Sequence, residues 1–563
     1  MKLNLKIIAK VSLVVLATSL YSSCKKYDNP PPVFEEIKDL TAAQRKVLVI
    51  SIDGLSGEEL KKNLPANISA LQKNAKFSYN TLITASNAGG WVSMLTGTGF
   101  SKHKISDDNF ERQQDESSDE HDDLVYFRNV FDYVTQYKSV TTAMVTPWKN
   151  LRDYVKNVDY APVVDTDKAV QDSAVSILSK VNNLGTLFVN FKDVEHAGES
   201  GGYFIENDKY KNAIVQSDTY IGNLLAAIKT RKNYEKEDWL IIVTSNHGGS
   251  ADEPQNGFTI VYNPAFKEFE LKKSGFNPVF YNTKTSRAVL TKDNGLYDAG
   301  ETKSFTVQMD VKFNATPNGY SSFFSKSTNL SGQSITGWQW AYYPGGKWVV
   351  TVGGTLNGGS GKQETASVDA PGTTDWHTYT MTVDYVNSAT RNLTTYMDGK
   401  KQNSINISAR KSLSTTEAFR IGHRAGDNDV VTPFYSANLA YFNTSLSEET
   451  IKSSFKLTDI TKHPNYGNLI GFWPMDEGTE GTLFNTVPGG FNMDLSGGYV
   501  WANLNSLYAP GTEPKPVTSN FSIPSTASDI AALTLYWMNI DILADFNYDG
   551  KPYLKNFEIE FLK

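Results

Sequence analysis

The sequence predicts a doubly wound α/β sheet with an inserted all-β jelly-roll sandwich. Residues 47–52 form a nearly continuous apolar run, typical of a strand that is buried on both faces of a parallel sheet. After about residue 285 the pattern changes to short alternating segments rich in Thr, Ser, Gly and aromatic residues, as β-sandwiches require. A helical pattern returns at residues 528–539, which indicates that the first domain resumes after the sandwich.

The remaining elements of the α/β domain follow in order along the chain. Apolar runs at residues 140–145, 187–191 and 239–244 predict three further buried strands. An amphipathic stretch at residues 210–231 predicts a helix between the last two of them. Strands that alternate with helices in this way build a doubly wound sheet.

Composition excludes several classes of protein. The chain has 563 residues, enough for two to four domains, and its single cysteine excludes an intramolecular disulfide framework. The 54 Lys and Arg residues against 61 Asp and Glu residues give a net charge of −7 without a basic block, so nucleic acid is not an expected partner. Aromatic residues make up 12% of the chain, which excludes wholesale disorder.

The amino-terminal segment resembles a bacterial lipoprotein signal peptide. Three lysines precede an apolar run at residues 11–20, which is too short to span a bilayer, and Ser22 and Ser23 lead into Cys24. This pattern predicts that residues 1–23 are removed, that Cys24 is lipidated and that the protein is anchored on the outer membrane. The proline-containing residues 24–43 then form a tether. The alternative is a soluble secreted protein with a cysteine there by chance.

Four places along the first domain place polar and charged residues beside predicted strands. Asp53 ends the first buried strand, at the sheet edge where open α/β folds place their sites. The other three are SNAGGWVSMLTG at residues 86–97, DVEHAGE at 193–199 and TSNHGG at 244–249. Together, in this order, they resemble the alkaline-phosphatase superfamily, especially its type I phosphodiesterase and sulfatase-like branches, over residues 44–285 and more weakly 520–563.

That resemblance implies phosphoryl or sulfuryl transfer through a covalent intermediate, with two metal ions, usually zinc. By analogy, Asp53, Asn246 and His247 would ligate one metal, while Glu195 and Glu199 would help to ligate the other. The position of the family's Thr, Ser or Cys nucleophile is occupied by Asn87.

The sequence departs from the family at most of these positions. An Asn87 amide cannot form the usual ester intermediate, Asn246 stands in place of an Asp, and Glu195 and Glu199 stand in place of an Asp and a His. A further His expected soon after residue 247 is missing. These departures predict a pseudoenzyme without a metal. A single calcium or magnesium ion, and an active dinuclear zinc enzyme, remain as alternatives, and a shifted alignment would make Thr84 or Ser86 the nucleophile.

Residues from about 300 to 480 resemble the laminin-G-like, concanavalin-A-like lectin family. The resemblance rests on short motifs at residues 305–307, 375–377, 395–399, 420–422, 437–442 and 446–449. Asp398-Gly399 suits a hairpin turn, because both residues tolerate positive φ. Such domains often bind sugars, sometimes with calcium. The resulting boundaries are residues 44–285 plus about 505–563 for the α/β domain and about 286–504 for the lectin-like domain.

Three aromatic residues, Trp338, Trp340 and Tyr342, fall on one face of a predicted strand. Aromatic rings stack on the apolar faces of sugars, so these residues are the first candidates for a glycan-binding platform. The alternative is that this face of the strand belongs to the core of the sandwich.

The sequence therefore supports three hypotheses of function. The first is an outer-membrane lipoprotein with an inactive phosphatase-like domain that binds a glycan, a polysaccharide or oligosaccharide, as an accessory of nutrient uptake. The second is an active metal-dependent phospho- or sulfoester hydrolase. The third is a scaffolding subunit of a membrane transporter complex.

Overall fold

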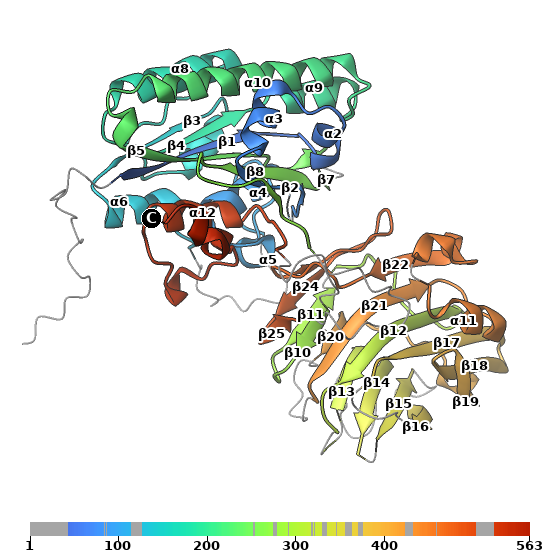
Figure 1. Cartoon of the computed structure of the whole chain (residues 1–563). Coiled ribbons are helices and arrows are strands. Elements are labelled where there is room, and N and C mark those ends of the chain that lie inside the picture. The colour runs from blue at the N-terminus through green and yellow to red at the C-terminus, as the bar shows by residue number, and fades with distance from the viewer. Residues whose placement is uncertain are drawn as a thin grey trace, which may run out of the picture.

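The computed structural model describes residues 43–83, 85, 87–113, 126–250, 254–273, 278–290, 292–316, 319, 321–328, 335–344, 346–354, 363–369, 375–422, 432–457, 459–502 and 523–562. Cys24, the predicted signal peptide and nearly all of the tether lie outside them. An α/β domain and a β-sandwich are seen side by side (Figure 1). No helix among the described residues has the length and apolarity needed to cross a bilayer.

The α/β domain is built on a seven-stranded sheet whose parallel centre confirms the predicted strands. The apolar sequence of β1 is buried from Val47 onward, and β1 pairs in parallel with β4 and β5 on either side. The sheet is mixed rather than all parallel, because β8 runs antiparallel to both β5 and β2. Its strands, in spatial order, are β3 (Thr141–Val145), β4 (Leu184–Phe191), β1 (Gln44–Ile52), β5 (Glu237–Thr244), β8 (Gly257–Tyr262), β2 (Ala75–Thr81) and β9 (Phe269–Glu270).

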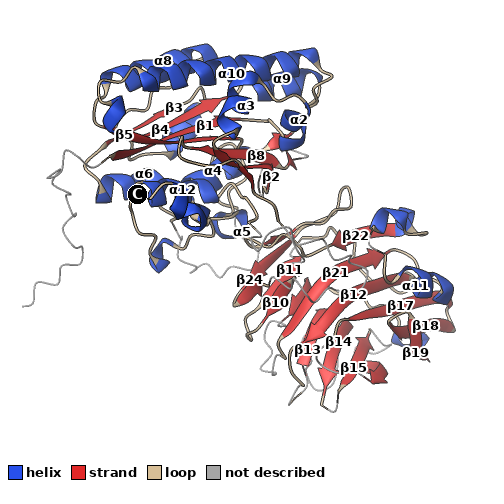
Figure 2. Cartoon of the chain, viewed as in Figure 1, coloured by secondary structure: helices blue, strands red, loops and turns tan. Residues whose placement is uncertain are grey.

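Helices cover both faces of this sheet, as Figure 2 shows. Alternate residues of β1 face opposite sides, so Leu48 and Ile50 belong to one core and Val47 and Val49 to the other. The first core lies under α2 (Gly57–Lys62), α3 (Ala66–Gln72), α8 (Asp167–Lys180), α9 (Asp193–Gly201) and α10 (Asp208–Lys229). The second lies under α4 (Asn87–Thr96), α6 (Val130–Tyr137), α7 (Lys149–Tyr154) and α12 (Asp529–Trp537), with α5 (Phe100–His103) adjacent to α4.

The carboxyl-terminal segment returns to the α/β domain, as the helical pattern at residues 528–539 predicts. Helix α12 is mostly apolar, and eight of its nine residues are buried, all except Tyr536. Ser525 O accepts a 2.8 Å hydrogen bond from Leu82 N, which fixes the incoming chain beside β2. The sandwich is therefore an insertion within the α/β fold.

The sandwich consists of two antiparallel sheets. The β12 sheet contains β19 (Lys400–Asn406), β18 (Thr390–Met397), β17 (His377–Asn387), β12 (Phe305–Phe313), β21 (Phe434–Phe442), β10 (Val279–Tyr281) and β25 (Tyr499–Trp501), with β22 (Leu469–Trp473) also on β21. The β14 sheet contains β16 (Gln363–Asp369), β15 (Lys347–Gly353), β14 (Gly337–Tyr343), β13 (Ser321–Ser327), β20 (Phe419–Gly422), β11 (Arg287–Leu290), β24 (Met493–Ser496) and β23 (Thr482–Leu483). Asp398 and Gly399 have φ of 49° and 72° and form the predicted turn.

The aromatic side chains of β14 form the core of the sandwich, and the prediction of a glycan platform there is wrong. Trp338 and Trp340 are 0% exposed and Tyr342 is 1% exposed, so no sugar ring can reach them. The Tyr342 ring stacks on Phe313 of the facing sheet with ring centroids 4.0 Å apart. Aromatic residues at alternate positions of a strand can mark either the inward face of a sandwich or an exposed binding face. In β14 they mark the inward face.

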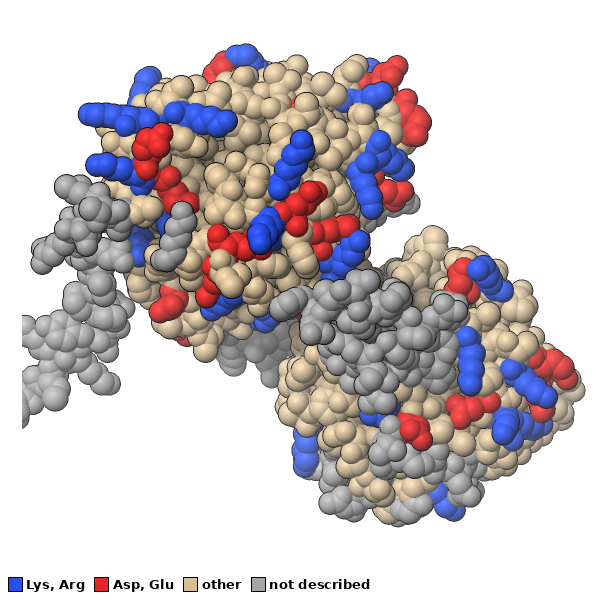
Figure 3. Space-filling view, in the orientation of Figure 1, with Lys and Arg blue, Asp and Glu red and all other residues tan. Residues whose placement is uncertain are grey.

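Polar side chains connect the two domains at their junction. Glu480, which is 6% exposed, accepts a 2.8 Å hydrogen bond from Ser528 of the α/β domain through Oε1. Lys104 of the α/β domain forms a 2.5 Å ion pair with Asp494 on β24. On the face shown in Figure 3, charges of both signs are interspersed over both domains and form no continuous basic surface.

Helix α12 should carry a large share of the stability of the α/β domain. Leu533→Ala would empty a fully buried site and lower the free energy of unfolding by about 2–5 kcal/mol. Leu543→Ala, at a position that is 48% exposed, is the control and should change it by less than about 0.5 kcal/mol. Chemical denaturation followed by tryptophan fluorescence measures both, and equal effects of the two variants would refute this assignment.

Candidate functional site

The predicted site residues meet at the carboxyl ends of the central strands. Asp53 directly follows β1, Glu195 lies on α9 just after β4, and Asn246 and His247 follow β5. Asn87 begins α4, which packs closely against the loop after β5. A Cβ atom on Gly90 would lie 2.1 Å from the Asn246 carbonyl oxygen, so a glycine is required for this approach.

Asp53 is fully buried and its carboxylate is held by neighbouring donors. Its Oδ2 accepts hydrogen bonds from Asn190 Nδ2 at 2.7 Å and Trp91 Nε1 at 3.0 Å, and its Oδ1 accepts one from Ser51 Oγ at 2.7 Å. Burial raises the pKa of Asp53, and the Glu195 carboxylate adds to this effect. The Lys192 ammonium opposes it, but the pKa still lies above its ordinary value. Three hydrogen-bond donors thus already occupy this carboxylate.

The central charge of the site is the ammonium of Lys192, directly after β4. Lys192 Nζ lies 2.9 Å from Glu195 Oε2 and 4.4 Å from the centroid of the Trp148 ring. Burial alone would lower the pKa of Lys192, but the carboxylates of Asp53 and Glu195 outweigh it and raise the pKa. Burial alone would likewise raise the pKa of Glu195, but His247, 3.5 Å away, and Lys192 lower it to about 2. This ion pair is largely buried, with the Lys192 and Glu195 side chains 12% and 5% exposed.

The position of the nucleophile is part of a network of amides. Asn246 Nδ2 donates to the Asn87 backbone oxygen at 3.3 Å and to Asn87 Oδ1 at 3.4 Å. Asn87 Nδ2 donates to Asp108 Oδ1 at 3.0 Å, and Asn246 Oδ1 accepts from His247 N at 2.8 Å. Asn87 has a φ of 32°, a conformation that Asn tolerates better than most residues. The two side-chain amides therefore link the start of α4 to the loop after β5, and neither provides a nucleophile.

One predicted ligand is not part of the cluster. The structure brings together Asp53, Asn87, Glu195, Asn246 and His247, whereas Glu199 is exposed one turn further along α9. Among the described residues, Glu199 has no hydrogen bond or ion pair with the cluster. Thr84 and Ser86, the alternative nucleophiles, lie outside the described residues.

The residues present do not fit a pair of zinc ions. Two buried atoms would suit a metal, His247 Nε2 and Glu195 Oε2, because neither meets the geometry of a hydrogen bond among the described residues. Each still has a charged neighbour, since His247 Nε2 lies 3.5 Å from Glu195 Oε1 and Glu195 Oε2 lies 2.9 Å from Lys192 Nζ. However, Asn246 is neutral, Asp53 already accepts three hydrogen bonds, and the Lys192 ammonium already pairs with Glu195. Within the described parts of the chain, no group of three or more His, Cys, Asp or Glu side chains is arranged to hold a metal. No catalytic step through a metal follows from this geometry.

Sequence reasoning missed the residues that complete the site. Lys192, Asn190 and Trp91 are not ligands in the family pattern, and only their contacts with Asp53 and Glu195 reveal their role. One signal was available, because Lys192 follows directly after the buried strand at residues 187–191. A lysine at that sheet edge must meet the carboxylates there.

Comparisons with known families agree with this architecture. Residues 47–299 match the family described as type I phosphodiesterase / nucleotide pyrophosphatase, and residues 283–452 match the concanavalin A-like lectin/glucanases superfamily. The chain joins a phosphodiesterase-like domain to a concanavalin A-like domain. Residues 459–554 match a domain of unknown function that spans the last strands of the sandwich and α12. The polar junction at Glu480 and Ser528 lies inside this third match.

Solved structures resemble parts of the chain at low identity. A protein from Bacteroides ovatus ATCC 8483, described as a candidate carbohydrate-binding protein, is 11% identical, with 46% of this chain and 76% of that chain covered and a TM-score of 0.31. Inactive murine ectonucleotide pyrophosphatase / phosphodiesterase 5 with AMP is 16% identical over 36% and 57%, with a TM-score of 0.29. The receptor-binding domain of a botulinum neurotoxin C/D mosaic is 15% identical over 32% and 42%, with a TM-score of 0.26. No curated protein matches the chain.

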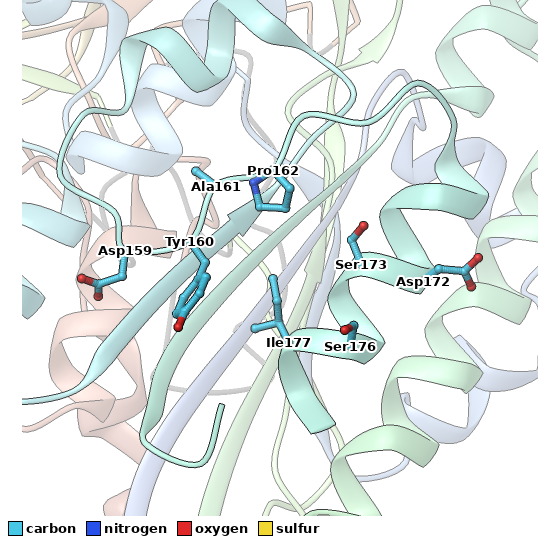
Figure 4. A pocket seen from close by; sticks show the side chains of 8 residues that line it. All are labelled: Asp159, Tyr160, Ala161, Pro162, Asp172, Ser173, Ser176 and Ile177. Carbon is cyan, nitrogen blue, oxygen red and sulfur yellow. The ribbon is translucent and has the colours of Figure 1, made fainter. Parts of the chain in front are cut away.

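An open pocket of about 610 Å³ lies away from this cluster. It is lined by Asp159, Tyr160, Ala161 and Pro162 on one side and by Asp172, Ser173, Ser176 and Ile177 of α8 on the other (Figure 4). Asp172 is already paired with Lys168, and Asp159 accepts hydrogen bonds from Thr142. None of its lining residues belongs to the candidate site.

The Lys192–Glu195 pair should stabilise the phosphodiesterase-like domain. Glu195→Gln would remove the nearest anion of a buried ammonium and lower the free energy of unfolding by about 1–3 kcal/mol. Glu199→Gln, at an exposed position on the same helix, should change it by less than about 0.5 kcal/mol. Denaturant titration of the two variants compares them, and a Glu195→Gln variant as stable as Glu199→Gln would contradict a stabilising pair.

Proposed function

We propose that this chain is a glycan-binding lipoprotein of the outer membrane, an accessory of nutrient uptake, whose phosphodiesterase-like domain does not hydrolyse esters. The observation that carries the proposal is the pairing of a concanavalin A-like domain with a site whose nucleophile position is an amide tied to Asn246 and Asp108. The first feature supports a saccharide ligand, and the second argues against turnover.

The argument against hydrolysis is chemical. Covalent phosphoryl or sulfuryl transfer needs an activated hydroxyl or thiol, and the Asn87 amide offers neither. The anionic transition state also needs concentrated positive charge. Here the ammonium of Lys192 is already paired with Glu195 at 2.9 Å, so its charge is not available to a substrate.

The best candidate for a glycan surface is the outer face of the β12 sheet. Val500, Phe280, Tyr435 and Lys312 stand opposite one another on the neighbouring strands β25, β10, β21 and β12. Their neighbours along these strands point into the core, so this row faces outward. The Phe280 and Tyr435 rings stack with centroids 4.5 Å apart, Lys312 Nζ lies 5.3 Å from the Tyr435 ring, and Val500 is 47% exposed. Partly exposed aromatic rings provide apolar contact area for a sugar.

Calorimetric titration of the full chain against a panel of polysaccharides should detect binding. The double variant Phe280→Ala, Tyr435→Ala should weaken the affinity about tenfold or more, because it removes both rings. Tyr466→Ala, which removes a 39% exposed tyrosine elsewhere on the sandwich, is the matched control and should bind as the wild type does.

The same preparation should not turn over nitrophenyl phosphate, a nitrophenyl phosphodiester or nitrophenyl sulfate. Turnover that chelators and Asp53→Ala abolish would establish the hydrolase hypothesis instead. Absence of binding to every glycan, together with co-purification with a membrane complex, would favour a transporter scaffold.

The membrane anchor is a separate part of the proposal. Its support is the position of Cys24, the single cysteine, directly after the apolar run and ahead of a proline-containing segment. When the full precursor is expressed in a Gram-negative host, Cys24→Ala should move the protein from the membrane fraction to the soluble fraction and abolish labelling by a fatty-acid analogue. An unlabelled wild type in the soluble fraction would contradict lipidation.

A further inference from the structure

We propose that the Lys192 ammonium is a permanent internal cation that takes the place of the metal ions at this sheet edge. The inference rests on the proposed function, in which this site does not hydrolyse esters, and it names the group that occupies the place of the metal ions. A site that had only lost metal ligands would still contain carboxylates without a counter-ion. Here Lys192 supplies the counter-charge.

The position of Lys192 is fixed by its backbone and by its side chain. Lys192 N donates a 2.9 Å hydrogen bond to Asp167 Oδ1, and Lys192 O accepts from His196 N at 3.1 Å. The side chain is 12% exposed, with the Trp148 ring 4.4 Å from Nζ and Glu195 Oε2 at 2.9 Å. A lysine held in this way contributes a charge at a defined point, whereas a solvated surface lysine does not.

The charges of the site agree with one fixed monovalent cation. The Glu195 carboxylate lies between two basic side chains, with Oε2 at 2.9 Å from Lys192 Nζ and Oε1 at 3.5 Å from His247 Nε2. Asn246 is neutral where the family has an Asp, and Asn87 is neutral as well. Two divalent ions would overcompensate this smaller negative charge, and an ion bound to Glu195 Oε2 would have to displace an ammonium that lies 2.9 Å away.

A second lysine ammonium lies among oxygen atoms near the carboxyl end of the chain. Residues 545–550 read Asp-Phe-Asn-Tyr-Asp-Gly, which matches the first half of an EF-hand calcium loop, but Asn556 stands where that loop has its bidentate Glu. Lys102 Nζ lies 2.7 Å from Asp549 Oδ1, 3.0 Å from Asn547 Oδ1 and 2.9 Å from Asn547 O. There too an ammonium is held by oxygens of the kind that bind a hard cation.

The experiment compares four full-length proteins, the wild type, Lys192→Ala, Lys192→Met and the exposed-lysine control Lys209→Ala. Each is analysed for bound metal after dialysis with zinc or manganese, and its thermal unfolding midpoint is measured with metal and with chelator. The wild type and the control should hold substoichiometric metal and unfold at the same temperature under both conditions.

The two Lys192 variants should then diverge. Lys192→Ala leaves carboxylates without a cation and leaves space beside them, so it should unfold at a lower temperature with chelator, bind one divalent ion per chain and regain stability with metal. Lys192→Met should also lose stability, but metal should not restore it, because the methionine side chain fills the space.

Two results would overturn the proposal. One is a wild type that carries stoichiometric divalent metal and loses stability with chelator. The other is a pair of Lys192 variants that unfold as the wild type does and take up no metal. Neither measurement uses a glycan or an ester, so failure here is distinguishable from failure of the proposed function.

Discussion

The charge on Lys192 is the constraint on which the candidate site depends. Parallel strands β1, β4 and β5 bring Asp53, Glu195 and His247 to one edge of the sheet, and these groups are 0–4% exposed. Carboxylates that lie together in a dry environment need a cation. Lys192, placed by the end of β4, provides one 2.9 Å from Glu195, while Asn190, Trp91 and Ser51 satisfy Asp53. The chain itself thus supplies a counter-charge for Glu195.

The sequence predicts the fold well, because the signals of the fold are long and repeated. The apolar runs that predict β1, β3, β4 and β5 are buried in the sheet, and the helical pattern at residues 528–539 corresponds to α12. The sequence does not predict that the sheet is mixed, because the apolar pattern of β8 is the same for a parallel and an antiparallel strand. The aromatic pattern of β14 fits either a binding platform or the core of the sandwich, because alternation does not say which face of a strand is inward; the structure shows that it is core.

The candidate site was predicted only in part, for a physical reason. Motif comparison locates ligands, so it placed Asp53, Glu195, Asn246 and His247 together and showed where they depart from the family. It also expected Glu199 among them, whereas α9 turns that side chain to solvent. Lys192 belongs to no ligand pattern, and its contacts with Glu195 and Trp148 exist only in three dimensions. A missing metal ligand is visible in the sequence. The contact between an ammonium and the remaining carboxylate is visible only in the structure.

Anomalous diffraction from wild-type crystals grown with zinc would test the internal-cation claim most directly. Data recorded on both sides of the zinc absorption edge locate any bound zinc independently of activity. We expect no anomalous peak between Asp53 and Glu195, and electron density for the Lys192 side chain that ends beside Glu195. A zinc peak bonded to Asp53 and Glu195, with Lys192 turned away from both, would contradict the claim.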